Sequence, residues 1–240
     1  MPEVALFVTC LVDQFDPEAG IGAVRLLEAA GCTVVFPGAQ TCCGQPAVNT
    51  GEPEAAAVLA RRFVEVFEPY PAVVSPSGSC VAMVRHWYPD LLEGSWRDRA
   101  RAVAERTHEL TGYLADVLGR SDVGARLSDT VTFHDACHGL RVLGTKDAPR
   151  RLLAGAGAQL VEMSEPEICC GFGGTFAAKH PEMSAPMADD KLAQAAATGA
   201  RWLVACDSGC LLHLAGRRRR TGTGPEPVHV AELLARGLGS

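Results

Sequence analysis

Cys42-Cys43-Gly44 occurs a second time in this chain, as Cys169-Cys170-Gly171. A lone cysteine precedes each copy by the same distance: Cys10 lies 32 positions before the start of the first copy, and Cys137 lies 32 positions before the start of the second. Packing alone does not explain thiols at matched positions in two parts of one chain. The pattern predicts that one unit carrying a soft-metal site was duplicated.

A later cysteine closes each set of thiols. Cys80 follows the first tripeptide, and Cys210 follows the second, with Cys206 just before it. Four thiolates are the usual ligand number of an iron–sulfur cluster. Cys206 stays open as a ligand or a core residue, whereas Cys32 has no cysteine at its matched position and is predicted to be buried. The two predicted ligand sets are Cys10, Cys42, Cys43 and Cys80 in the first half, and Cys137, Cys169, Cys170 and Cys210 in the second.

The two halves also share an order of local patterns. Each begins with a strand-like run that ends at its lone cysteine, continues with the end of an amphipathic helix stopped by glycine, and reaches the tripeptide after a β-rich run. A second helix and a buried strand then lead to the last thiol. The predicted segments are 5–10, 25–31, 33–36, 52–67 and 72–75 in the first half, and 132–137, 151–157, 159–162, 181–198 and 202–205 in the second.

This alternation predicts an α/β fold of two tandem Rossmann-like parallel-sheet repeats related by internal duplication. We expect a first cysteine-rich repeat at 1–84, a helical connector at 85–130 with a helix over 97–109, and a second cysteine-rich repeat at 131–240. The carboxyl ends of parallel strands meet at one edge of a sheet, where open α/β folds bind ligands. The thiols that follow the strands are therefore expected to converge at that edge.

Composition and charge narrow the class of protein. The chain has 240 residues, of which 48% are hydrophobic, and a formal net charge of −6. The negative charge argues against a general nucleic-acid or anionic-membrane binder, and the basic run Arg217–Arg220 is predicted to be a solvated loop. No apolar run approaches the roughly 18–20 residues that span a bilayer. With no signal-peptide pattern at its start, the chain is expected to be cytoplasmic, where its thiols stay reduced.

Adjacent cysteines favour a cluster over a single zinc ion. In an extended chain their side chains point to opposite faces, which suits one tetrahedral metal poorly, whereas on a bend they reach different irons of one cluster. Gly44 and Gly171 supply the backbone freedom for such a bend. Zinc is the main alternative, with His134, Cys137 and His138 as candidate ligands, although packing and local hydrogen bonding are the favoured roles of the two histidines.

Four stretches of the chain resemble the lactate utilisation protein A family, within the wider cysteine-rich CCG family that includes the cysteine-rich subunit of heterodisulfide reductase. The resemblance runs over nearly the whole chain and implies an iron–sulfur component of a cytoplasmic multi-subunit system that oxidises L-lactate to pyruvate. In the heterodisulfide reductase relatives, each complete motif holds a non-cubane [4Fe–4S] cluster with five cysteines. The stretches are Phe7–Asp13 (FVTCLVD), Cys42–Ala47 (CCGQPA), Ser75–Cys80 (SPSGSC) and Cys169–Phe176 (CCGFGGTF).

Both halves depart from that five-thiol pattern. Pro76 and Ser77 stand where the fuller motif of the first half carries another cysteine. In the second half, Cys206 lies four residues before Cys210, wider than the Cys-x-x-Cys of the complete motif, and Ser208 stands where some relatives place a cysteine. A four-thiol cluster, a serine-ligated iron and an empty first site therefore all stay open. The predicted cofactor is one or two [4Fe–4S] clusters, with zinc as the alternative.

The predicted activity is electron transfer. Oxidising a 2-hydroxy acid needs a hydride acceptor, and iron–sulfur clusters carry single electrons. The glycine patterns at 171–176 and 20–25 lack the last glycine of a dinucleotide-binding fingerprint. We therefore predict a subunit of a lactate-oxidising complex rather than a complete enzyme, with partners that by resemblance include a ferredoxin-like protein. The alternatives are a cluster-dependent thiol/disulfide reductase subunit and a zinc-stabilised scaffold subunit of an oxidoreductase complex.

Overall fold

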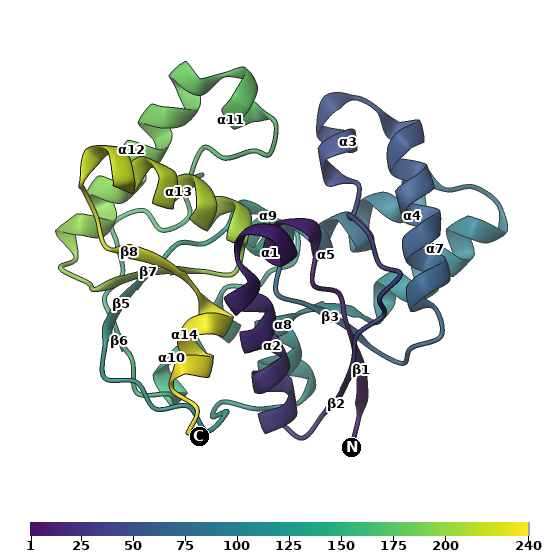
Figure 1. The fold of residues 1–240 in the computed structure, drawn as a ribbon, viewed down its shortest axis with the longest axis horizontal. Helices are drawn as coiled ribbons and strands as arrows, with labels where there is room; N and C mark the ends of the chain where they lie inside the picture. The colour runs from purple at the N-terminus through teal and green to yellow at the C-terminus, as the bar shows by residue number, and fades with distance from the viewer. Residues whose placement is uncertain (240) are drawn as a thin grey trace.

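Two parallel sheets of four strands each form the framework of residues 1–239, which are the residues that the computed structural model describes (Figure 1). The first sheet has the order β2-β1-β3-β4, and every neighbouring pair in it is parallel. Its strands are β1 (Glu3–Leu6), β2 (Thr33–Val35), β3 (Val73–Ser75) and β4 (Thr107–Glu109).

The second sheet repeats this topology. Its order is β6-β5-β7-β8, so the first strand of each half again lies between the second and the third. All of its pairs are parallel as well. The predicted fold class, an α/β chain of two duplicated parallel-sheet units, is confirmed. The strands are β5 (Thr130–Phe133), β6 (Gln159–Leu160), β7 (Trp202–Ala205) and β8 (Glu226–His229).

Helices follow the strands in both halves, and the first half has more of them than the second. Those of the first half are α1 (Cys10–Phe15), α2 (Pro17–Ala29), α3 (Gln45–Thr50), α4 (Pro53–Phe67), α5 (Gly78–Ala82), the π-helical turn η1 (Met83–Trp87), α6 (Tyr88–Leu91), α7 (Ser95–Glu105), α8 (Leu110–Gly112) and the π-helical turn η2 (Tyr113–Val117). Those of the second half are α9 (Cys137–Arg141), α10 (Asp147–Gly155), α11 (Phe176–Lys179), α12 (Pro181–Ala197), α13 (Ser208–Thr221) and α14 (Val230–Arg236).

Helices α4 and α12 show how closely the repeat is kept. Each begins with proline, whose fixed φ suits the first helical position and whose missing N–H is not needed there. Each buries one stripe with helical spacing, and the buried residues fall at the same five positions of both helices. They are Ala56, Ala60, Phe63, Val64 and Phe67 in α4, and Ser184, Ala188, Lys191, Leu192 and Ala195 in α12.

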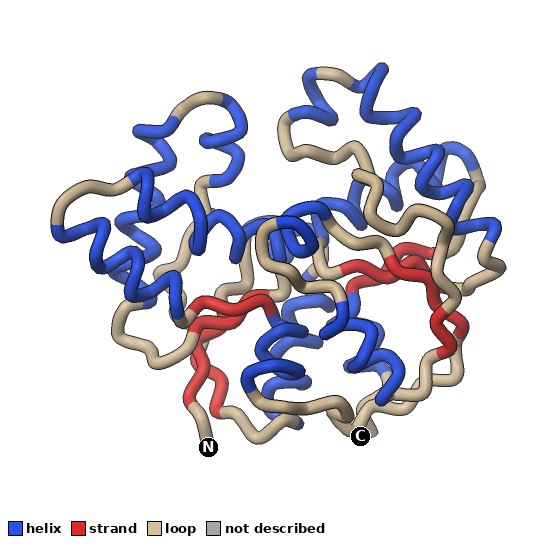
Figure 2. Tube along the Cα trace, turned by 180° about the vertical axis from the view of Figure 1, so that it is seen from behind, coloured by secondary structure: helices blue, strands red, loops and turns tan. Residues whose placement is uncertain are grey.

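The halves pack against each other through pairs of helices, with one helix of each pair from each half. Helix α2 of the first half lies on α14 of the second, and α10 of the second lies on α8 and η2 of the first. Figure 2 shows helices filling the space between the two sheets. Gly22 allows the closest of these contacts, because a Cβ there would lie 2.6 Å from the carbonyl oxygen of Ala231. One hydrophobic core runs through both halves, with Leu26 and Leu27 from α2 and Leu152, Leu153 and Leu234 from the second half.

Two local predictions were wrong. The helix predicted over 97–109 ends at Glu105, since residues 107–109 leave it to form β4 beside β3. The segment predicted as a helical connector therefore contributes a strand to the first sheet, while the domain boundaries themselves stay a prediction. Arg217–Arg220 was predicted as a loop but belongs to α13, whose buried face and left-handed Gly222 cap carry the helix to Thr221. None of the helices in the described residues combines the length and apolarity required to cross a membrane.

Candidate metal centre between the two halves

The predicted ligands all follow strands on the carboxyl side of the sheets. Cys10 begins α1 after β1, and Cys137 begins α9 after β5. The paired cysteines lie in the loops after β2 and β6, while Cys80 and Cys210 lie in the first turns of α5 and α13 after β3 and β7. Parallel pairing brings these strand ends to one edge of each sheet. The thiols of each half therefore meet although they are far apart in sequence.

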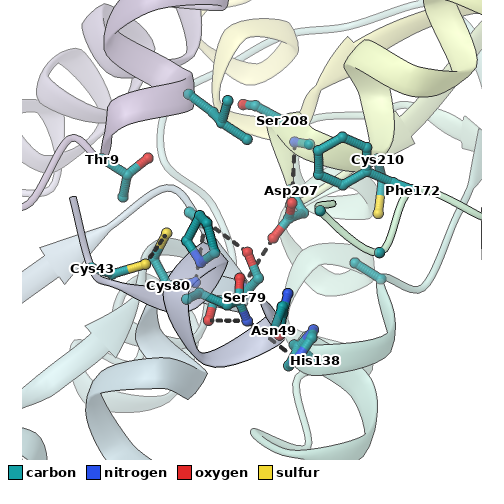
Figure 3. Close-up of a pocket in the computed structure, with 18 of the residues that line it drawn as sticks. Thr9, Cys43, Asn49, Ser79, Cys80, His138, Phe172, Asp207, Ser208 and Cys210 are labelled. Atoms are coloured by element: carbon teal, nitrogen blue, oxygen red, sulfur yellow. Dashed lines mark hydrogen bonds between the residues drawn. The ribbon is translucent and has the colours of Figure 1, made fainter. Parts of the chain in front are cut away.

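Both sets of thiols line one cavity. It has a volume of about 370 Å³ and lies between the halves, with Cys43 and Cys80 on one wall and Cys210 and Phe172 on another (Figure 3). All eight predicted ligands line it: Cys10, Cys42, Cys43, Cys80, Cys137, Cys169, Cys170 and Cys210. Cys32 and Cys206 are absent from the lining and belong to the hydrophobic core. The structure thus separates the cysteines into cavity thiols and core thiols.

We call Cys10, Cys42, Cys43 and Cys80 the first thiol site. The Sγ atoms of Cys10 and Cys42 are 3.6 Å apart, and those of Cys43 and Cys80 are 3.3 Å apart. The N–H of Gly44 donates to the Cys42 sulfur at 3.5 Å, and Gly44 takes a φ of +85°, a region that side chains disfavour. All the cysteines in the described residues are free, so four unoxidised thiols face one another here.

Cys137, Cys169, Cys170 and Cys210 form the second thiol site, which repeats this arrangement. The N–H of Gly171 donates to the Cys169 sulfur at 3.4 Å, and Gly171 has a φ of +86°. A Cβ on Gly171 would also lie 2.6 Å from the carbonyl oxygen of Ser184. Glycine is therefore required for the bend, as the sequence predicted, and also for the close approach of α12, which the sequence did not predict.

The thiols perturb one another's ionisation. Hydrogen bonding from Cys10 and Cys43 lowers the pKa of Cys42 to about 2, and hydrogen bonding from Cys137 and Cys170 lowers the pKa of Cys169 to about 2. The same hydrogen bonds, together with burial, raise the pKa values of Cys10 and Cys137. In each site the thiolate form of one cysteine is thus stabilised, and ionisation of its neighbour is made less favourable. Ionisation of all four thiols of one site would therefore require a bound cation to offset their mutual repulsion.

The second thiol site has a histidine beside it. His134 directly follows β5 and is 1% exposed. One nitrogen of its ring and the sulfurs of Cys170 and Cys210 all lie within 4.8 Å of one another. Hydrogen bonding with Cys170, and then the nearby imidazole of His134, lower the pKa of Cys210 to about 7. His138 instead points to the cavity, 3.5 Å from the Cys137 sulfur and 3.3 Å from the Gln45 amide. The two histidines that were considered together with Cys137 as zinc ligands therefore lie apart: His138 is beside Cys137, whereas His134 is beside Cys170 and Cys210.

Lys191 is a buried charged residue near the second thiol site that was not predicted from the sequence. This lysine is 1% exposed and donates to the Glu165 carbonyl at 2.5 Å. Burial lowers its pKa, while the charges of Cys170 and Glu165 oppose that change. The only sequence signal was a lysine on the apolar stripe of the second predicted helix, which matches Phe63 of the first. Lys191 does not line the cavity, and among the described residues the cavity lining includes no Lys or Arg.

Comparison with known proteins agrees with this geometry. The cysteine-rich domain called CCG matches residues 4–85 and 131–215, one match for each half. The fold and the paired thiol sites therefore define a protein of the CCG class. The chain is 45% identical over 235 residues to lactate utilization protein A of Macrococcus caseolyticus, covering 97% of this chain and 96% of that protein. It is 42% identical over 239 residues to lactate utilization protein A 2 of Bacillus cereus, covering 98% and 99%. The chain belongs to the lactate utilisation protein A family, as the sequence predicted.

The similarity to one solved structure is weak. A proposed Asp/Glu racemase from Yersinia pestis aligns over 98% of this chain and 96% of that chain, with a TM-score of 0.39 and 9% identity. No conclusion on fold or function rests on a match of that quality. The clustered cysteines themselves are the informative feature, because soft thiolate donors in this number suit a soft metal or a cluster.

Proposed function

We propose that this chain is the iron–sulfur electron-transfer subunit of a cytoplasmic complex that oxidises L-lactate to pyruvate. The two thiol sites would hold one or two [4Fe–4S] clusters, through Cys10, Cys42, Cys43 and Cys80 and through Cys137, Cys169, Cys170 and Cys210. The relatives named lactate utilization protein A support the process, and the thiol geometry supports the cofactor. A bound cluster would accept and release single electrons.

The convergence of both thiol sites on one cavity carries the proposal. Two redox centres that share a cavity lie close enough to exchange electrons without a mobile carrier between them. The N–H groups of Gly44 and Gly171 already point at ligand sulfurs, and hydrogen bonds to sulfur stabilise the reduced form of a cluster. The chain's own residues thus hold the sulfurs, bury one half of them (Cys43, Cys80, Cys170 and Cys210) and set the charge around each site.

The same cavity is a poor site for lactate itself. A carboxylate substrate is normally bound by Arg or Lys, and among the described residues the cavity lining offers neither, while Asp207 adds a negative charge. Lactate oxidation would therefore take place on a partner subunit that carries the hydride acceptor, and this chain would pass the electrons on. A ferredoxin-like subunit is the proposed recipient.

The first experiment is metal analysis of anaerobically purified protein. We expect about four irons and four sulfides per chain for one cluster, or about eight of each for two, with an iron–sulfur EPR signal. Zinc without sulfide would contradict the electron-transfer function and leave a zinc-stabilised scaffold. In cells, Cys170→Ala should abolish growth on lactate while the protein still folds. The matched control is Cys32→Ala, since Cys32 is a buried core thiol outside the cavity, and this control should grow.

One observation favours a second candidate function. Most of the surface that lines the cavity is apolar, and Phe172 contributes to it, so a thiol or disulfide with an apolar body would fit there. A cluster-dependent thiol/disulfide reductase subunit would use this space for its substrate. Spectral change of the cluster on addition of a small thiol would support that activity, and an unchanged spectrum would leave simple electron transfer.

A further inference from the structure

His134 is buried beside the second thiol site, and no nitrogen or oxygen atom partners its ring. In the described part of the chain, neither Nδ1 nor Nε2 makes a hydrogen bond to such an atom, and the ring interacts instead with the sulfur of Cys210. A buried polar group with no partner costs free energy, and native proteins rarely leave one in that state unless it has another role. Its ligand nitrogen lies within 4.8 Å of the sulfurs of Cys170 and Cys210. The imidazole is therefore placed like a metal ligand.

Other residues that could supply a fifth donor near Cys210 are already engaged. Cys206 is fully buried in the core beside Glu109, whose charge helps raise the thiol's pKa after burial itself. The Asp207 carboxylate accepts hydrogen bonds from Gly209 N–H at 3.1 Å and from Ser79 N–H at 2.9 Å. The Ser208 hydroxyl donates to Asp16 at 2.7 Å. None of these three groups is free to turn toward the thiols.

The first thiol site has no such group. Its matched position, three residues before the lone cysteine, is Phe7, which packs edge-on against Phe63 with ring centroids 4.9 Å apart. The Ser77 hydroxyl accepts from the N–H of Cys80 at 3.4 Å and caps α5. The first site therefore offers four thiols, and the second offers four thiols and the imidazole of His134, besides His138, whose ring is already hydrogen-bonded to Cys137 and Gln45.

We propose that His134 is a fifth protein ligand of the second thiol site, binding one iron of its cluster through an imidazole nitrogen. The identity of the metal as iron rests on the proposed function; the donor set rests on the geometry above. Imidazole is an accepted ligand of iron in clusters, where it replaces thiolate and raises the reduction potential. The two halves would then hold centres of different ligation within a duplicated scaffold.

The test is pulsed EPR of anaerobic protein carrying ¹⁵N-labelled histidine, poised with reductant or oxidant until the cluster is paramagnetic. We expect a strong nitrogen coupling in the wild-type protein. The coupling should be lost in His134→Phe, a change to the residue found at the matched position of the first half. It should persist in His138→Phe, because His138 touches Cys137 only as a hydrogen-bond neighbour. Loss of the coupling in His138→Phe alone would overturn the proposal.

If the His134→Phe protein folds poorly, the spectrum of the wild-type protein still tests whether a histidine nitrogen binds the cluster. Iron and sulfide in the expected amounts without a strong nitrogen coupling would overturn the ligand role of His134 and leave the electron-transfer function standing. If the protein binds zinc without sulfide, the function fails, and X-ray absorption at the zinc edge decides the ligand. An imidazole that His134→Phe removes supports the proposal, whereas an all-sulfur shell overturns it. Protein that binds neither metal overturns both.

Discussion

The two thiol sites share their donors and differ in what lies behind them. Behind the first, Phe7 and Phe63 pack ring against ring. Behind the second, the matched positions hold His134 and Lys191, both 1% exposed. The duplicated strands and helices place the sulfurs alike because backbone geometry does not depend on these side chains. The electrostatic surroundings of the two sites, however, do depend on these side chains.

A neighbouring pair of positions repeats the contrast. Val8 and Val24 of the first half match Asp135 and Arg150 of the second. Arg150 holds the fully buried Asp135 carboxylate through two hydrogen bonds of 2.8 and 2.9 Å and also binds Glu162. Apolar packing in one half is thus replaced by a charged network in the other. One duplicated scaffold can therefore give two sulfur-lined sites with different electrostatic surroundings.

Exchanging the residues behind the sites should have the largest effect on stability. In metal-free protein, Phe7→His should lower the free energy of unfolding by about 2–4 kcal/mol, since it removes aromatic packing and buries an imidazole among apolar rings. His134→Phe should change it by less than about 1 kcal/mol, because it removes a buried polar group that has no nitrogen or oxygen partner. Denaturant unfolding of the two variants measures both. Equal losses would mean that His134 makes a structural contribution of its own.

Removing the positive charge of the buried lysine should change the reduction potential of the second centre but not that of the first. Lys191→Met should lower the reduction potential of the second centre, because a positive charge nearby stabilises the reduced cluster. Two unit charges roughly 8 Å apart at an effective dielectric constant of about 20 interact by about 2 kcal/mol, or roughly 90 mV for one electron, which sets the expected size of the effect. The matched change, Phe63→Met, should leave the potential of the first centre almost unchanged. EPR-monitored redox titration checks both, and an unchanged second potential would refute the electrostatic difference.

Asp207 tests the contact between the halves. Its match in the first half is Ser77, and its carboxylate caps α13 while accepting from Ser79 of the other half. Asp207→Ser should keep part of the cap but lose the second hydrogen bond, at a cost of about 1–2 kcal/mol. Ser77→Ala, which removes a cap within one half, should cost about 1 kcal/mol. Thermal unfolding compares them, and an Asp207→Ser protein as stable as the wild type would contradict the bridging role.

The smallest expected difference is between Cys42 and Cys169. Their folded pKa of about 2 lies below the ordinary thiol value of about 8.5, so both should stay thiolates at pH 5 and be protonated only as the pH falls toward 2. Cys10 and Cys137, with raised pKa values, should stay protonated. Brief alkylation of metal-free protein at pH 5, read by mass spectrometry, should modify Cys42 and Cys169 to a similar extent. Selective labelling of only one of them would break the symmetry of the two sites.

Much of the fold was predictable because its signals are local. The apolar runs before Cys10, Cys80, Cys137 and Cys210 form strands, and the stripes of α4 and α12 form helices within one or two residues of the predicted bounds. Strand β4 was not predictable, since Thr107-His108-Glu109 has no apolar alternation and is held by pairing with β3. The helical state of Arg217–Arg220 likewise depends on the rest of α13, whose Leu211 and Leu214 are buried.

The sequence by itself determined the duplication, the parallel α/β class and the eight thiols that face a site, because spacing along the chain and residue type carry that information. Only the tertiary structure decided that both thiol sites line one cavity, that Cys206 lies in the core, and that His134 stands without a nitrogen or oxygen partner beside Cys170 and Cys210. These facts depend on how the two halves pack and on where a strand end directs a side chain. No single stretch of sequence specifies either, since contacts between distant segments form only when the whole core closes.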